Sequence, residues 1–301
     1  MEHAAAIAAD PDAALFASPT RLDHIGRIVV PVMINGRGPF RFIVDTGASH
    51  STLSPNLAQR LGLAVAAEPI EVNGITGTAL VPSVQIAQLQ AGDLSISNTS
   101  FPLVWAPLMA GADGILGAAG LTQQRLFVDF RHNRVAISRA GRRSTPAGFT
   151  RVPATRLPGG LLAVEAMVGG VRVRAVIDTG SERSLGNPAL QAALNERRPL
   201  GTLSRVTDVY GATTEVVSGD AQLVPVIVLG GLKINDATLV YGDFHIFDVW
   251  HMQKLPALII GMDILGTVSS MAIDFEHQDF YIGGAPTWRD DTSIWKTYKA
   301  E

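Results

Sequence analysis

The stretch Val44-Asp45-Thr46-Gly47 recurs 133 positions later (178 − 45) as Ile177-Asp178-Thr179-Gly180. Each copy ends an apolar run rich in β-forming residues, 40–44 in the first case and 173–177 in the second. A carboxylate at the end of a buried strand is costly unless other groups stabilise it. Two aspartates in such matching contexts predict a pair that meets in the folded chain.

The residues around the two tetrapeptides also match. A strand is predicted before each one, over 27–34 and over 162–168, and each strand runs into a turn. The first turn is Asn35 to Gly38, where Asn-Gly readily takes positive φ. After each tetrapeptide, Pro following Ser or Asn predicts a short helix, over 54–61 and over 187–194.

The order of later features agrees as well. Gly-containing hairpin tips are predicted at 72–77 and 209–214, and apolar-apolar-Gly segments follow at 115–117 and 259–261. The offset grows from 133 at the aspartates to 144 at these last glycines (261 − 117), as small insertions in the second copy would produce. The chain is therefore an internal duplication of two homologous halves, with a period too long for a solenoid.

Strand and turn signals dominate, so we predict an all-β protein of two homologous, barrel-like lobes with pseudo-twofold symmetry. The predicted layout, in chain order, is an N-terminal tail (1–26), a first lobe (27–140), a linker (141–150), a second lobe (151–284) and a C-terminal tail (285–301).

Composition narrows the classes of function. The 301 residues carry a net charge of −3 and no long basic run, which argues against a nucleic-acid partner. The absence of cysteine excludes disulfides and thiol chemistry. No apolar run is long enough for a membrane span. Two interpretations of the Ala-rich first twenty residues stay open: a frayed tail or short helix, or a chain from which a secretion signal has been removed.

Two Asp-Thr-Gly sequences, each followed by a Gly-tipped hairpin and then by apolar-apolar-Gly, resemble the aspartic peptidases of the pepsin and retropepsin superfamily. The resemblance covers residues 27–284 and is closest to bacterial retropepsin-like proteins with both halves in one chain. It implies a bilobed acid-protease fold, an aspartic endopeptidase activity on a polypeptide substrate, and Asp45 and Asp178 as the catalytic pair. It requires no cofactor, no metal and no dimerisation.

The chemistry of paired carboxyls is consistent with this activity. Two carboxyls about 3 Å apart cannot both ionise, so they share one proton across the useful pH range. The ionised partner takes a proton from a water held between them, and the protonated partner polarises the scissile carbonyl and later protonates the leaving nitrogen.

Residues close to the two aspartates are expected to hold them in position. Gly47 and Gly180 allow the sharp turn that brings amides near the carboxylates. The resemblance implies interlocking of the two loops through Thr46 and Thr179, and places Gly117 and Gly261 beside them. Position 48 is Ala, whereas position 181 is Ser and could donate a hydrogen bond to a carboxylate. From this mixed pair we expect a pH optimum between the strongly acidic and near-neutral extremes.

Both hairpin tips are candidate flaps over the substrate. The residues concerned are Asn73, Gly74 and Ile75 in the first half, and Tyr210, Gly211 and Ala212 in the second. Pepsin-like enzymes have one flap, in the first half, with a Tyr; here the Tyr-Gly pair lies in the second half. We therefore expect both tips to cover the cleft and Tyr210 to hydrogen-bond near the aspartates.

The remaining polar candidates have plainer interpretations. His50 is expected at a rim or in a structural role. His132 and His277 are matched between the halves, in a pattern that predicts an edge strand, and Asp129 and Asp274 beside them are expected to cap turns. His245 and His251 are six apart and lack a metal-ligand spacing.

Two alternatives to an active peptidase stay open. One is a catalytically silent peptide-binding module that has kept the cleft. The other is an enzyme made latent by residues 1–26 or 285–301 lying in the cleft. Export, most simply to the periplasm, is expected from the resemblance to bacterial relatives, and a cytoplasmic location is not excluded.

Overall fold

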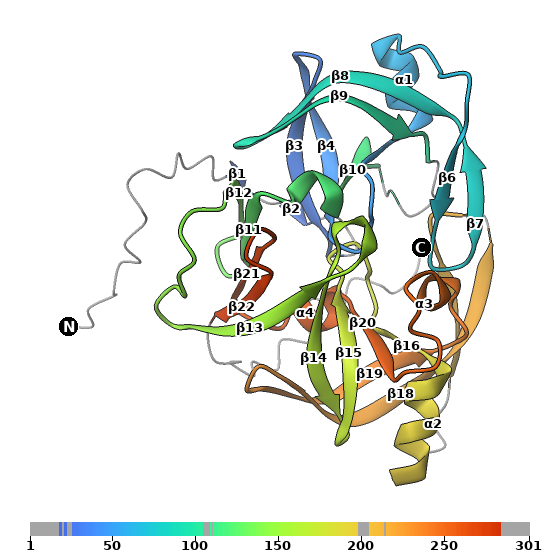
Figure 1. Cartoon of the computed structure of the whole chain (residues 1–301), viewed down its shortest axis with the longest axis vertical. Coiled ribbons are helices and arrows are strands. Elements are labelled where there is room, and N and C mark those ends of the chain that lie inside the picture. Colours follow the sequence, from blue (N-terminus) through green and yellow to red (C-terminus); the bar gives the residue numbers. More distant parts are fainter. Residues whose placement is uncertain are drawn as a thin grey trace, which may run out of the picture.

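The structure, a computed structural model, describes residues 18–19, 21–22, 26–104, 109, 111–197, 205–213 and 215–283. It is mostly β, with two barrel-like lobes related by the duplication, and the predicted fold class is confirmed (Figure 1). One continuous apolar core runs through both lobes, from Ile28 to Ile282. No helix within the described ranges is long and apolar enough to cross a membrane.

The first lobe is built on a seven-stranded sheet. Its path is β5 (Thr52–Leu53), β10 (Gly114–Gly117), β4 (Arg37–Asp45), β3 (Ile28–Ile34), β8 (Ser83–Ala91) and β9 (Leu94–Pro102), with β2 (Arg21–Leu22) paired to β3. Asn35 and Gly36 both take positive φ between β3 and β4, as the Asn-Gly signal predicts. Helix α1 (Pro55–Leu61) begins at Ser54, whose side chain accepts a hydrogen bond from the amide of Leu57.

The second lobe repeats this plan, and its β18 is longer than the corresponding β8. Its strands are β14 (Leu162–Val168), β15 (Val171–Ile177), β16 (Leu185–Gly186), β17 (Arg205–Tyr210), β18 (Val216–Leu229), β19 (Leu232–Tyr241) and β20 (Ala257–Ile260). Its helices are α2 (Pro188–Arg197), α3 (His245–Val249) and α4 (Met262–Leu265). Asn187 caps α2 by accepting from the amide of Leu190.

Strands from both halves form one sheet that joins the lobes. Its order is β1 (Ser18–Pro19), β12 (Arg134–Arg139), β11 (Gln124–Asp129), β21 (Ser270–Asp274), β22 (Asp279–Gly283) and β13 (Phe149–Arg156), which continues into the second lobe through β14. The expectation of an edge strand near His132 and His277 is wrong, because β11 and β21 pair with each other at the centre of this sheet. Part of the segment predicted as a tail (1–26) is strand, since β1 pairs with β12 and β2 with β3.

Two hairpins extend toward each other over the junction of the lobes. One is β6 (Ile70–Asn73) with β7 (Thr78–Val81), and the other is formed by β17 and the start of β18 (Figure 1). The tips fall where the sequence predicts them. Below the tips, β4 and β15 end at the same central point, and each is flanked by a parallel strand, β10 or β20.

Candidate active site

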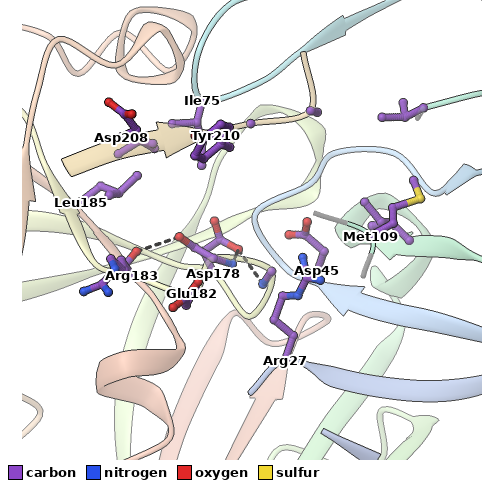
Figure 2. Close-up of a pocket in the computed structure, with 17 residues that line it drawn as sticks. Arg27, Asp45, Ile75, Met109, Asp178, Glu182, Arg183, Leu185, Asp208 and Tyr210 are labelled. Atoms are coloured by element: carbon purple, nitrogen blue, oxygen red, sulfur yellow. Dashed lines mark hydrogen bonds between the residues drawn. The ribbon is translucent and has the colours of Figure 1, made fainter. Parts of the chain in front are cut away.

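Asp45 and Asp178 lie at the ends of β4 and β15, and the structure brings their carboxyls together. Each carboxyl packs over the glycine of the opposite loop: a Cβ added to Gly47 would lie 2.3 Å from Asp178 Cγ, and one added to Gly180 would lie 2.1 Å from Asp45 Cγ. Only glycine leaves room for this approach. Both aspartates line one cavity, as Figure 2 shows.

Backbone amides hold one oxygen of each carboxyl. Asp45 Oδ1 accepts from the amides of Gly47 and Ala48 at 3.0 and 2.9 Å. Asp178 Oδ1 accepts from the amides of Gly180 and Ser181 at 2.8 and 3.1 Å. Each carboxyl is therefore fixed by its own turn, and the two turns have the same geometry although the residue after the glycine differs.

The two loops are locked together through their threonines. Thr46 Oγ1 donates to the carbonyl oxygen of Ile177, and Thr179 Oγ1 donates to that of Val44, both at 2.6 Å. Each hydroxyl also accepts the amide hydrogen of the other threonine, at 3.1 and 3.2 Å. Both threonines are buried, so this reciprocal set of four bonds sets the distance between the loops.

A second matched pair of residues supports the loops and was missed in the sequence. The amide of Gly117 donates to Ser51 Oγ at 3.1 Å, and that of Gly261 donates to Ser184 Oγ at 3.0 Å. These serines are separated by 133 positions (184 − 51), the same offset as the aspartates, so the duplication itself was the signal that could have found them. Ser184 Oγ also donates to Asp263 at 2.6 Å, a bond for which the first half has no equivalent, because Ala119 occupies that place.

Burial and the charge of the neighbouring carboxyl change the pKa values of the two aspartates to different extents. Burial raises the pKa of Asp45, although a hydrogen bond with Asp178, the amides of Gly47 and Ala48, and the charge of Arg27 partly oppose it. Burial and the charge of Asp45 together raise the pKa of Asp178 well above its usual value. The pair therefore holds a single proton over a range of pH above that of solvated carboxyls.

The cavity above the dyad has a volume of about 180 Å³ and is lined by residues of both lobes. The first lobe contributes the apolar side chains of Val104, Met109 and Ile115. The second lobe contributes charged side chains, those of Glu182, Arg183 and Asp208. The first lobe also contributes Arg27, and the second also contributes Leu185 and Val209, so apolar and charged side chains line the cavity on both sides.

A model of the aspartyl protease family matches residues 30–119 and 164–264, and both matched stretches contain an Asp-Thr-Gly. The chain belongs to this family. The crystal structure of an aspartic proteinase from Irpex lacteus has the same fold, with a TM-score of 0.52 at 12% sequence identity, over 92% of this chain and 99% of that chain. No curated protein sequence matches the chain significantly.

In this aspartyl protease family member the tips of the two hairpins contact each other. Thr76 Oγ1 and Thr213 Oγ1 are 2.8 Å apart and hydrogen-bonded, and Gly74 packs on the backbone and Cβ of Ala212. His245 Nε2 lies 2.8 Å from Thr78 Oγ1 and 3.3 Å from Asn73 Oδ1, so the second lobe also holds the β6–β7 hairpin. Ile75, Tyr210, Gly211 and Ala212 line the cavity over the dyad, whereas Asn73 and Gly74 support the first tip from outside it.

Two expectations about polar side chains need correction. Ser181 Oγ donates to the carbonyl oxygen of Arg183 at 2.7 Å, not to a carboxylate. The Tyr210 side chain is half exposed and makes no hydrogen bond with the described residues, so the expected bond near the aspartates is not formed in this structure. The importance of the buried Arg27 was missed, because it only opens the predicted strand 27–34 and belongs to no motif.

The other polar candidates lie away from the dyad. Asp129 and Asp274 accept from the amides of His132 and His277, the turn-capping role expected of them. His50 is exposed. Within the described ranges, no group of three or more His, Cys, Asp or Glu residues could hold a metal ion. Most of the segments considered as inhibitory, 1–26 and 285–301, lies outside the described residues.

Proposed function

We propose that this chain is an aspartic endopeptidase that hydrolyses peptide bonds with a water activated between Asp45 and Asp178. The observation that carries the proposal is the convergence of the two carboxyls, each packed on the glycine of the other loop. Family membership supports a protease role.

Amide hydrolysis needs a base for the attacking water and an acid for the leaving nitrogen. The dyad supplies both, because it holds one proton between two carboxyls. The threonine bonds and the amide cradle fix the carboxyls before substrate arrives, so little reorganisation is required during the reaction. The raised pKa values of both aspartates favour a pH optimum between the strongly acidic and near-neutral extremes.

The expected substrate is an extended polypeptide lying between the dyad and the flaps. The β6–β7 hairpin is a separate two-stranded sheet, and β17 is the last strand of its own sheet, so both flaps offer unpaired strand edges. Backbone hydrogen bonds to such edges bind extended chains largely independently of their sequence. Entry of a chain requires the tips to part, which breaks the Thr76–Thr213 hydrogen bond.

One chain supplies both aspartates, so we propose that activity does not depend on dimerisation. An exported, periplasmic location stays a prediction from the sequence.

The test is cleavage of an unfolded protein between about pH 3 and 8, a range that brackets the carboxyl titrations. The wild type should cleave, and Asp45→Asn and Asp178→Asn should each lower kcat/KM by roughly 10³-fold or more, because neither half of the dyad works alone. Asp129→Asn is the matched control, since Asp129 caps a turn outside the cavity. Wild-type cleavage that survives both dyad substitutions would contradict the proposal.

A wild type that binds peptide without cleaving it would favour the silent binding module. In that case, removal of residues 1–17 and 285–301, which keeps the paired strands β1 and β2, separates latency from loss of function. Cleavage that appears after trimming indicates an inhibitory tail, and continued inactivity indicates the module.

A further inference from the structure

The two halves differ in the residue that faces each aspartate across its hairpin. In the first hairpin Val29 pairs with Ile43, and in the second Ala163 pairs with Val176. Extending each antiparallel register by two residues places Arg27 opposite Asp45 and Leu161 opposite Asp178. Residues directly opposite in antiparallel strands point to the same face, with Cα atoms about 4.5–5.5 Å apart.

Arg27 is buried beside the dyad and carries a permanent charge. Its exposed fraction is 5%, and it is the only buried basic residue in the described part of the chain. Figure 2 shows its side chain extending toward Asp45 in the cavity that both residues line. Leu161 is fully buried and apolar. The first half therefore has a cation beside its aspartate, and the second half has an apolar residue at the corresponding position of the register.

On the basis of the proposed peptidase function, we propose that Arg27 is a positioning residue that keeps Asp45 as the ionised partner of the dyad and leaves the shared proton on Asp178. A nearby guanidinium stabilises the carboxylate form of an acid, whereas an apolar neighbour disfavours it. The roles of the two carboxyls, which symmetry alone would leave equivalent, are thereby assigned.

The assignment gives a balanced reaction. Asp45 takes a proton from water as the water oxygen bonds to the carbonyl carbon, while Asp178 hydrogen-bonds the oxygen that becomes negative. Asp178 then gives its proton to the nitrogen as the C–N bond breaks and the carbonyl re-forms. Transfer of the proton from Asp45 to Asp178 restores the starting state, with one carboxylic acid and one amine released.

The pKa directions agree with this assignment. Burial raises the pKa of both aspartates, but Arg27 opposes the rise at Asp45, whereas the charge of Asp45 adds to the rise at Asp178. Other charged or titratable groups also line the cavity, all from the second lobe: Glu182, Arg183, Asp208 and Tyr210. These remain in place when Arg27 is changed, so the comparison below isolates one charge.

The experiment compares wild type with Arg27→Gln, which removes the charge but keeps hydrogen-bond donors, and with Arg27→Lys, which keeps the charge. The first readout is the acidic limb of the pH profile of kcat/KM. The second is titration of ¹³C-labelled aspartate carboxyls by NMR, with the Asp45 and Asp178 signals assigned through their Asn variants. The second readout does not require cleavage, so it tests the inference even if the proposed function fails.

In Arg27→Gln, the acidic limb and the Asp45 titration should move up by about one pH unit, the low end of the effect of an arginine beside a carboxyl. Arg27→Lys should restore most of that shift. If Arg27→Gln lacks the wild-type circular dichroism spectrum, Arg27→Met replaces it, and the same shift is expected. An unmoved Asp45 titration in the folded, uncharged variant overturns the inference. A raised KM with an unmoved acidic limb also overturns it, because Arg27 would then bind substrate.

Discussion

The two halves of this protein agree in the groups that hold the aspartates and differ in the groups that surround them. Threonine, serine and glycine occupy matched positions around both loops. The Thr and Ser hydroxyls bond to backbone groups, and the glycines allow close packing. The charged neighbours are not matched. The position of Arg27 in the first half corresponds to Leu161 in the second, and Asp263 of the second half corresponds to Ala119 in the first.

The matched residues control the geometry of the two carboxyls, and the unmatched residues control their charge. A pair of carboxyls that must meet needs two equivalent supports, because a displacement of either loop changes the same distance. A fixed location of the shared proton needs inequality, because two identical carboxyls would hold it equally. Substitutions at matched positions should therefore have matched effects, and substitutions at unmatched positions should affect protonation.

The largest effect in this comparison is expected from the glycines that touch the opposite carboxyl. In Gly47→Ala and Gly180→Ala, the new methyl group would lie 2.3 and 2.1 Å from a carboxyl carbon, so the dyad must spread. A displacement of about 1 Å at reacting groups can cost 10²-fold. We expect kcat/KM to fall by roughly 10²-fold or more in both variants.

Gly141→Ala is the control for these variants, because a Cβ there meets no atom within 4 Å. It should retain wild-type activity in the same assay. If Gly180→Ala keeps more than about a tenth of the wild-type kcat/KM, the close packing of the dyad on the opposite loop does not control the reaction.

The threonine lock should be the next most sensitive feature. Thr46→Val and Thr179→Val each leave one buried carbonyl and one buried amide without a partner. We expect the free energy of unfolding to fall by about 2–4 kcal/mol, equally in the two halves, because each unsatisfied group costs about 1–3 kcal/mol. Urea denaturation followed by fluorescence measures the loss.

Thr52→Val provides a matched control for this measurement. Thr52 Oγ1 is buried but has no hydrogen-bond partner among the described residues, so its removal leaves nothing newly unsatisfied. The expected change is below about 1 kcal/mol. Equal losses in Thr179→Val and Thr52→Val would mean that the hydroxyl bonds between the loops contribute no special stability.

A smaller, pH-dependent difference is expected between the matched aspartates of the central sheet. Asp274 is fully buried and bound by Arg125 at 2.7 Å, whereas the side chain of Asp129 is 20% exposed. Although burial raises it, hydrogen bonds from His277 and Arg125 hold the pKa of Asp274 below its usual value. We expect Asp274→Asn to cost roughly 2–3 kcal/mol at neutral pH, below the range for fully buried pairs because Arg125 reaches solvent.

The sign of the pH effect follows from the lowered pKa. The contribution of the Asp274 carboxylate is complete above about pH 4, the unfolded-state pKa, and is lost as pH falls through the folded-state value. The difference between wild type and Asp274→Asn should therefore shrink below pH 4 in urea titrations. Asp129→Asn should cost under about 1 kcal/mol; an equal cost at the two sites would contradict the comparison.

The sequence predicted those parts of the fold and site that depend on local pattern. The strand 162–168, the helix starts at Pro55 and Pro188, and both hairpin tips follow from turn and capping residues. The meeting of Asp45 and Asp178 could be predicted because the duplication repeats a costly residue in the same context.

The parts that the sequence did not predict depend on contacts between distant residues. The pairing of β11 with β21 joins segments about 145 positions apart, and neither strand by itself shows whether it will be central or at an edge. Arg27 lies just before β3, and its importance appears only when the hairpin register places it opposite Asp45. The direction of the Ser181 hydroxyl depends on how its loop bends toward Arg183.

Ser181 gives the smallest expected effect, and it distinguishes the two explanations of dyad asymmetry. The sequence suggested that its hydroxyl supports a carboxylate, as Ala48 cannot. In the structure both residues support their aspartates through the backbone amide alone, at 3.1 and 2.9 Å. Ser181→Ala should therefore leave the acidic limb of the pH profile in place and cost only about 0.5 kcal/mol for the exposed bond to Arg183.

The informative measurement is the pH profile of Ser181→Ala beside that of Arg27→Gln. If only Arg27→Gln moves the acidic limb, the asymmetry of the dyad comes from the charge opposite Asp45. A shift of similar size in Ser181→Ala would instead mean that its hydroxyl turns to the carboxylate during the reaction. The residue after each glycine would then set the protonation of the pair, as the sequence alone suggests.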